Sequence, residues 1–512
     1  MQDIVVGTAP LAIADAVAVA RHGAPVRLSD DALERMRHTR AVIERLASDT
    51  APHYGVSTGF GALATTPIPP ADRRQLQRSL VRSHAASAGP EVEREVVRGT
   101  MLLRLATLAT GRTGVRPLVA ETYAALLNAG ITPIVGEYGS LGCSGDLAPL
   151  AHCALAAMGE GDVRDAAGKR MPAAAALEAA GIEPLVLEEK EGLALINGTD
   201  GMLGMLALAI TDLDLLLATA DVAAAMSVEG VAGTDSVFAA DLHALRPHPG
   251  QIASAAAMRA MLEGSPVIAA HRSTGFTRVQ DAYSLRCAPQ VHGAARDTVE
   301  HARTVAGREL ASAIDNPVVT LDDRVESNGN FHGAPVGYVL DFLAIAAADV
   351  ASMSERRTDR MLDRARSHGL PPFLAGDPGV DSGHMIAQYT QAGIVSELKR
   401  LAVPASVDSI PTSAMQEDHV SMGWSAARKL RRAIDGLTRV LAIEVLTAAR
   451  AIDLRGEGSA PASARVVAEL RTRVEGPGPD RYLSPEIAAA TDLVASGAVV
   501  RAAGVAPKEE NR

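Results

Sequence analysis

The stretch "GSLGCSGDLAPLAH", residues 139–152, joins a glycine-rich turn to the start of a helix. Glycines at positions 139, 142 and 145 surround a thiol and a hydroxyl, those of Cys143 and Ser144. The alanine- and leucine-rich run that begins near Asp146 favours a helix. A turn of this kind suits a nucleophile, a phosphate-binding loop or an ordinary tight loop, and the surrounding sequence has to distinguish them.

Spacing excludes two familiar motifs at this turn. A nucleophile elbow requires glycine two positions on each side of the serine, and Asp146 stands where the second glycine would be. The glycine spacing also matches neither a dinucleotide-binding fingerprint nor a Walker loop. A reactive Cys143 thiolate at the helix start, paired with His152, stays open at this point.

A rarer chemistry needs a small residue, a serine and a glycine in this order. The amide nitrogen of Gly145 can attack the carbonyl of Cys143, and loss of two water molecules closes a five-membered ring that carries the Ser144 carbon as a methylidene. Glycine leaves the attacking nitrogen unhindered and tolerates the strained backbone. A helix start nearby stabilises negative charge drawn into the ring. On these three residues alone, a plain glycine-rich turn is the simpler interpretation.

Composition favours a helical globular protein. Of the 512 residues, 47% are hydrophobic and only 3% aromatic, which suits close-packed helices better than β-sheets. The formal charge of −11 argues against a nucleic-acid partner. The three cysteines, Cys143, Cys153 and Cys287, form neither a disulfide framework nor a metal-knuckle spacing, and no metal is expected.

No membrane association is expected either. The N-terminal residues lack the basic start, apolar run and cleavage site of a signal peptide. The apolar stretch 201–210 meets Asp212 and Asp214 well before it reaches membrane-spanning length. The sequence therefore predicts a soluble cytoplasmic protein.

Hydrophobic periodicity predicts helices through most of the chain. Ser29 and the two following aspartates are typical of the cap of a first clear helix. Further helices are expected around 72–83, 93–110, 117–128, 199–260, 336–363, 384–403 and 423–454, with a small hairpin in 160–171. We expect a single domain over 1–512. A loop-rich part of about 1–200 carries the Cys143–Gly145 turn, and a helical bundle with a C-terminal part fills about 200–512.

Seven blocks in this sequence resemble those of one enzyme family. They are "YGVSTGFG" (54–61), "SHAASAG" (83–89), "GSLGCSGDLAPLAH" (139–152), "NGT" (197–199), "QDAYSLRCAPQ" (280–290), "NFHG" (330–333) and "PASVDSIPTSAMQEDHVSM" (404–422). In this order they resemble the histidine and phenylalanine ammonia-lyase family, and within it the members that act on histidine. Cys143 departs from the usual alanine, and Asp200 and Met415 also differ from the commonest family residues.

The resemblance implies a mainly α-helical protein with a long-helix bundle core of the ammonia-lyase and fumarase-like type. It implies a homotetramer whose active sites are shared between subunits. It also implies the ring described above, 4-methylidene-imidazol-5-one (MIO), made from Cys143, Ser144 and Gly145, with no added organic cofactor. The implied reaction is elimination of ammonia from L-histidine to give trans-urocanate, the first step of histidine degradation.

The resemblance also assigns roles around the ring. Tyr54 is the base that removes the β-proton, and Tyr283 lines the site and assists proton handling. Arg286 grips the substrate carboxylate with its guanidinium fork. Asn197 lies beside the ring and the substrate, although it could merely order its Asn-Gly turn. The two tyrosines and the arginine also have plain structural alternatives, as packed side chains and a surface ion-pair partner.

Four more residues are expected at the substrate. His84 and Glu417 should contact the imidazole ring, because relatives that act on phenylalanine carry glutamine at the position of Glu417. The alternative is that His84 caps a helix and Glu417 pairs with an arginine. Gln280 and Phe331 are expected behind the site and in its wall.

Two other classes compete with this interpretation. A helical lyase of the fumarase and argininosuccinate lyase type would share the architecture without the ring, but its "GSSxMPxKxN" stretch is absent from the sequence. A catalytically inactive scaffold would have little need to keep both Arg286 and the glycine loop.

Overall fold

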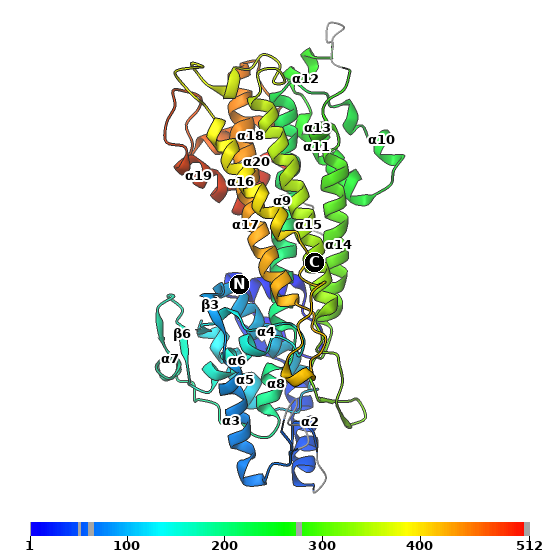
Figure 1. Ribbon diagram of the computed structural model, residues 1–512, viewed down its shortest axis with the longest axis vertical. Helices are drawn as coiled ribbons and strands as arrows, with labels where there is room; N and C mark the ends of the chain where they lie inside the picture. Colours follow the sequence, from blue (N-terminus) through cyan, green and yellow to red (C-terminus); the bar gives the residue numbers. More distant parts are fainter. Residues whose placement is uncertain (1, 50–52, 60–65, 273–278, 506–512) are drawn as a thin grey trace. The chain divides into compact units, whose positions relative to one another are not determined.

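The computed structural model describes residues 2–49, 53–59, 66–272 and 279–505, and it is mainly α-helical (Figure 1). The predicted fold class is confirmed. Phe60 and Gly61, the last two residues of the block that starts at Tyr54, lie outside the described residues. Contacts divide the chain into two compact units, and the single-domain expectation stays a prediction. The first unit is 1–208, 302–341 and 404–428, and the second is 209–301, 342–403 and 429–512.

Helix α4 forms the core of the first unit, because most of its residues are buried. It packs against α1, α5 and α6, while α3, α6 and α8 pack on one another. The helices of this unit are α1 (Ile13–His22), α2 (Asp30–Ser48), α3 (Arg73–His84), α4 (Arg94–Ala109), α5 (Pro117–Asn128), α6 (Leu147–Ala157), α7 (Ala173–Ala180), α8 (Glu191–Ile196) and the 3-10 helices η2 (Pro70–Asp72) and η5 (Ser413–Met415).

Short strands pair at the edges of the first unit. β1 and β2 are parallel, with Ile4 opposite Val26, and the other pairs, β3–β5, β4–β6–β7 and β8–β9, are antiparallel. Their bounds are β1 (Ile4–Val6), β2 (Val26–Leu28), β3 (Ala88–Glu91), β4 (Thr132–Pro133), β5 (Gly136–Tyr138), β6 (Asp162–Arg164), β7 (Arg170–Pro172), β8 (Val318–Val319) and β9 (Val325–Glu326).

Four long helices dominate the remaining structure: α9 (Asp200–Gly230), α14 (Ala288–Leu310), α15 (Ala334–Leu362) and α17 (Gly423–Arg455). Each of these four has residues in both units. The helices wholly within the second unit are α10 (Ala240–Ala244), α11 (Pro249–Leu262), α12 (Pro266–Ala270), α13 (Tyr283–Arg286), α16 (Met385–Leu401), α18 (Pro461–Arg471), α19 (Ser484–Ala495), α20 (Ala498–Ala503) and the 3-10 helices η3 (Ser236–Phe238) and η4 (Pro372–Leu374).

Buried charges connect the long helices inside the second unit. Glu444 on α17 accepts hydrogen bonds from Ser227 Oγ on α9 at 2.7 Å and from Arg357 Nη2 on α15 at 2.9 Å. Asp221 on α9 accepts from the ring of His292 on α14 at 2.8 Å. A buried charge without a partner is costly, so these pairs fix which helix faces meet.

Most predicted helices agree with the structure, with two kinds of difference. The expected cap is confirmed, since Ser29 Oγ accepts from the amide of Ala32, and the small hairpin is β6–β7. The helical stretch expected over 199–260 consists of separate helices: α9 ends at Gly230, α10 is short, and α11 begins at Pro249, a residue that favours the first helical position. Helices α1 and α14 were not predicted from the sequence.

Two helical segments are long and apolar enough to cross a membrane by length and composition, 191–230 and 334–362. Of their most apolar windows, 78% and 61% are buried inside the protein. Burial of this extent is typical of core helices, so these segments give weak support for a membrane span.

Candidate active site

The Cys143–Gly145 turn lies in the first unit, between β5 and α6, and chain segments far apart in sequence hold it. The carbonyl of Gly142 accepts hydrogen bonds from the amide of Gly333 at 2.9 Å and from Ser421 Oγ at 2.7 Å. The backbone before the cysteine is therefore fixed from two sides.

The close approach of Gly145 to another chain segment requires glycine. Its φ is +85°, a left-handed conformation that other residues rarely adopt. A Cβ atom here would lie 2.2 Å from the carbonyl oxygen of Gly198. The next amide, that of Asp146, donates to the same Gly198 oxygen at 2.7 Å. The turn is thus packed directly against the segment that holds Asn197.

Asp146 anchors the far side of the turn. Its fully buried carboxylate accepts from the amides of Gly201 and Met202 at 2.8 and 2.9 Å, and from Ser140 Oγ at 2.8 Å. Two free amides at the start of α9 are satisfied in this way. Burial raises the pKa of Asp146 to about 7, against the lowering effect of these hydrogen bonds.

Arg104 fixes the backbone of Asn197. This buried guanidinium on α4 donates to the carbonyls of Asn197 at 3.0 Å and Ala194 at 3.3 Å, where α8 ends. A cation is favourable at the C-terminus of a helix. Asp200 lies 3.5 Å from the same guanidinium, and burial raises the pKa of that carboxyl group while Arg104 opposes the shift.

One cavity of about 870 Å³ collects most of the predicted site residues. Its lining includes Tyr54, His84, Cys143, Ser144, Asn197, Phe331 and Glu417. Leu147, Leu193 and Ile196 supply an apolar part of the wall. Gly145 is buried behind it.

Glu417 is the central polar group of this cavity. Its Oε1 accepts from Ser144 Oγ at 2.7 Å, and its Oε2 accepts from Cys143 Sγ at 3.1 Å and Thr412 Oγ1 at 2.9 Å. Backbone hydrogen bonds with Thr412 hold Glu417 in an isolated antiparallel bridge. Ser144 is present here as the unreacted serine, so these contacts describe the turn before any ring closure.

His84 presents a neutral imidazole to the cavity. Burial lowers its pKa, against the raising effects of the Leu80 carbonyl and of Glu417. Its Nδ1 lies 2.9 Å from the Leu80 carbonyl oxygen, which can only accept a hydrogen bond. The proton is therefore assigned to Nδ1, and Nε2 is left as an acceptor.

Asn197 brings an unsatisfied acceptor to the same cavity. Its buried Oδ1 has no hydrogen-bond partner among the described residues. Buried amide oxygens are rarely left unpaired, so this atom is suited to a donor from a bound molecule.

The structure argues against a thiolate nucleophile at Cys143. Burial and the neighbouring Glu417 raise the pKa of this thiol to about 12. His152 hydrogen-bonds Ser87 Oγ at 2.8 Å, and burial lowers the pKa of this histidine. A cysteine–histidine nucleophile requires a thiolate and a protonated imidazole, and both shifts oppose these charged forms.

The remaining predicted residues belong to the second unit. The guanidinium carbon of Arg286 lies 4.7 Å from the centre of the Tyr283 ring, a cation–π distance, and Tyr283 is 69% exposed. Arg286 Nε is buried without a partner among the described residues. Gln280 lines a smaller cavity of about 140 Å³ beside Asp281. The roles of these residues stay predictions.

Sequence reasoning missed two residues that shape the site, Asp146 and Arg104. The sequence around Asp146 predicts only the start of a helix, because the acceptor role of its carboxylate depends on amides more than fifty positions away. Arg104 did carry a signal, because it is a lone charge in the apolar run "MLLRLATLA". Within the described ranges, no group of three histidine, cysteine or acidic side chains is arranged to hold a metal ion.

The chain belongs to the aromatic amino acid lyase family, whose model matches residues 11–472. It is therefore an enzyme of the carbon–nitrogen lyase class, as predicted. The chain is 64% identical over 505 residues to the histidine ammonia-lyase of Streptomyces avermitilis, covering 98% of each protein. Its fold is similar to that of Trypanosoma cruzi histidine ammonia-lyase, with a TM-score of 0.91, 38% identity and coverage of 99% and 96%. The tyrosine aminomutase of Streptomyces globisporus is also similar, with a TM-score of 0.93, 37% identity and full coverage of both chains.

Proposed function

We propose that this chain eliminates ammonia from L-histidine to give trans-urocanate. The observation that carries the proposal is the cavity in which Glu417 and His84 lie together with Ser144. The high identity to a histidine ammonia-lyase over nearly the whole chain supports the same substrate.

The residues of the turn fit the MIO ring. The positive φ of Gly145 and its contact with Gly198 give the tight bend that ring closure needs. The start of α6 follows directly and favours negative charge drawn toward it. The ring would supply an electrophilic carbon that withdraws electrons from the substrate.

The imidazole of histidine matches the polar groups of the cavity. Glu417 can accept one N–H and favours the charged imidazolium form, whose second N–H can be accepted by Nε2 of His84. A phenyl ring would bury both acceptors without a partner, at a cost of several kcal/mol. This asymmetry favours histidine over phenylalanine.

The other site residues would hold and move protons. Asn197 Oδ1 can accept a hydrogen bond from the substrate amine, since it has no partner among the described residues. Tyr54 lines the cavity and is proposed as the base that removes the β-proton. Phe331 would help to exclude water. Arg286 and Tyr283 are proposed to complete the site within a homotetramer, where the arginine grips the substrate carboxylate.

Substrate comparison tests the assignment directly. Purified protein is incubated with L-histidine, L-phenylalanine or L-tyrosine, and both ammonia and the unsaturated acid are measured. Ammonia and trans-urocanate should form much faster from histidine than the corresponding products from the other two. Comparable rates on all three, or a β-amino acid in place of urocanate, would contradict the proposed reaction.

Intact mass tests the cofactor independently of turnover. The purified chain should weigh two water molecules less than its sequence encodes, with near-ultraviolet absorbance that Ser144→Ala abolishes. An active protein with the encoded mass would refute the ring.

Assembly is proposed from the family together with exposed apolar side chains. Phe342 and Ile345 on α15 are each 46% exposed and border a cavity of about 510 Å³ next to α14. If sites are shared in a cytoplasmic tetramer, mixing Tyr54→Phe with Ser144→Ala should restore part of the activity through hybrid tetramers. No recovery, under conditions shown to exchange subunits, would count against shared sites.

A further inference from the structure

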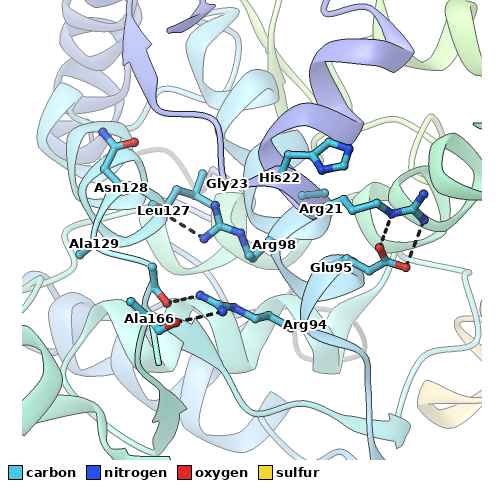
Figure 2. Close-up of a pocket in the computed structure, with 12 residues that line it drawn as sticks. Arg21, His22, Gly23, Arg94, Glu95, Arg98, Leu127, Asn128, Ala129 and Ala166 are labelled. Carbon is cyan, nitrogen blue, oxygen red and sulfur yellow. Dashed lines mark hydrogen bonds and ion pairs between the residues drawn. The ribbon is translucent and has the colours of Figure 1, made fainter. Parts of the chain in front are cut away.

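A second cavity, of about 430 Å³, lies in the first unit where α1 and α5 end beside α4 (Figure 2). Three arginine side chains line it, Arg21, Arg94 and Arg98. Among its described lining residues, none also lines the cavity of Ser144. The proposed activity therefore does not account for this concentration of positive charge.

One of the three charges is already neutralised. Arg21 donates to Glu95 through Nε at 2.6 Å and through Nη2 at 3.3 Å. Figure 2 shows this pair turned toward each other, whereas Arg94 and Arg98 point toward the chain around Ala129. The unusual feature is the second pair of arginines.

Arg98 is only 4% exposed, and its described hydrogen-bond partners are neutral. It donates to the carbonyl of Val19 through Nε at 3.2 Å and Nη2 at 3.0 Å, and to the carbonyl of Leu127 through Nη1 at 3.1 Å. These carbonyls belong to the last turns of α1 and α5. Burial and the positive charge of Arg94 lower the pKa of Arg98.

Arg94, one helical turn before Arg98, likewise has neutral partners among the described residues. It donates to Thr132 Oγ1 at 3.4 Å and to the carbonyls of Ala166 and Gly130 at 3.3 and 3.1 Å. A guanidinium carries five N–H groups, so three bonds leave two donors on each arginine.

The charge balance at this pair is positive. The C-termini of α1 and α5 each contribute about half a negative charge, roughly one in total. Arg94 and Arg98 contribute two full positive charges, and no described carboxylate forms an ion pair with either. About one positive charge is left over, next to donors that form a fork suited to oxyanions.

We propose that this cavity binds a phosphate group, either as the free ion or as a small phosphate monoester. A tetrahedral oxyanion has acceptors on several sides and can engage the two guanidinium groups at once. The cavity is large enough for a phosphate with a short organic substituent.

Calorimetric titration with inorganic phosphate tests the site, with potassium chloride at matched ionic strength as the reference. Arg94→Gln removes one of the two unpaired charges from an exposed side chain. Arg170→Gln is the matched control, because it removes an exposed arginine of the same unit that pairs with Asp162 outside this cavity. Wild type and the control should bind phosphate saturably, and Arg94→Gln should bind it about tenfold or more weakly.

A second variant and a second ligand make the test sharper. Arg98→Lys keeps the charge but loses the fork, so it should also weaken phosphate binding. Glycerol phosphate, compared with inorganic phosphate, distinguishes the sources: tighter binding of the ester indicates an esterified ligand, and weaker binding indicates the free ion. Equal phosphate affinity in wild type and Arg94→Gln, or no saturable binding, overturns the proposal. Activity on histidine should be unchanged in Arg94→Gln.

Discussion

Replacing Asp146 by asparagine tests how the Cys143–Gly145 turn is anchored. The neutral amide can keep an oxygen toward the amides of Gly201 and Met202, which Asp146 now satisfies. The NH2 group of the asparagine would face Ser140 Oγ, which already accepts a hydrogen bond from the amide of Gly142. The hydroxyl proton of Ser140, which Asp146 now accepts, would lose its acceptor. One lost buried hydrogen bond costs about 1–2 kcal/mol. At pH 5 the variant should therefore be less stable than wild type by roughly that amount.

The stability of wild type should also depend on pH through the Asp146 carboxyl group. Asp146 has a folded-state pKa of about 7, above its ordinary value of 3.8. Its stabilising contribution is complete below the unfolded pKa and is lost as pH rises through the folded one. Wild type should therefore lose about 3 kcal/mol from this group between pH 5 and pH 8. Asparagine does not titrate. Between pH 5 and pH 8 the free energy of unfolding of wild type should therefore fall by about 3 kcal/mol relative to that of Asp146→Asn.

Urea unfolding of both proteins at pH 5, 6, 7 and 8 measures this shift. Because all other titrating groups are shared, the difference between the two free energies of unfolding isolates Asp146. A difference that stays constant over this range would refute the reasoning, since it would mean that Asp146 is ionised throughout. Asp146→Ala provides a second reference, because it removes the acceptor at every pH and should cost about 3–5 kcal/mol in acid.

Three further predictions concern the turn and its cavity. Gly145→Ala should abolish the near-ultraviolet absorbance and keep the mass that its sequence encodes, because its Cβ would overlap the Gly198 carbonyl. Gly168→Ala is the control: Gly168 has a similar φ of +84°, and its Cβ would have no atom within 4 Å. This control should keep the absorbance and the loss of two water molecules. Glu417→Gln should lower kcat/KM for L-histidine by about 10- to 100-fold while the mass still shows ring closure; normal activity would exclude Glu417 as the imidazole partner. The pKa of the Cys143 thiol is about 12, against an ordinary 9.0, so very little of it is thiolate at pH 8. Cys143 should therefore react with iodoacetamide at pH 8 about a thousandfold more slowly than free cysteine, as measured by peptide mapping. Rapid labelling would contradict the buried, protonated thiol.

Local signals explain how much of the fold was predictable. Helix α5 is bounded by Pro117 and by an Asn-Ala-Gly stop, and the predicted range of 117–128 matches it. The boundaries between α9, α10 and α11 were not predicted, because alanine and leucine on both sides continue the helical composition. Helix α14 was not predicted, although only its first three residues, 288–290, belong to the block 280–290.

Long-range contacts explain why the site was only partly predictable. The residues that line the cavity came from family blocks, and no spacing rule links Ser144 to Glu417, which lies 273 positions later. Arg104 and Asp146 were not singled out because most of their partners are backbone groups of other segments, and backbone groups leave no mark in the sequence. Their positions become meaningful only when α4, α6, α8 and α9 are assembled.

The contacts of Glu417 connect ring formation to substrate binding. In the unreacted turn, Oε1 of Glu417 accepts the hydroxyl of Ser144, while Oε2 already accepts from Cys143 and Thr412. If the proposed ring forms, the Ser144 hydroxyl leaves as water, and Oε1 loses its donor. Glu417 is half-buried, and a bound substrate would cover its free oxygen, so this oxygen favours a new donor, which an imidazole N–H supplies. The same dehydration that creates the electrophile would thus prepare Glu417 for histidine. Cys143, where the family usually has alanine, keeps a thiol donor on the second oxygen and so holds the carboxylate in place for that contact.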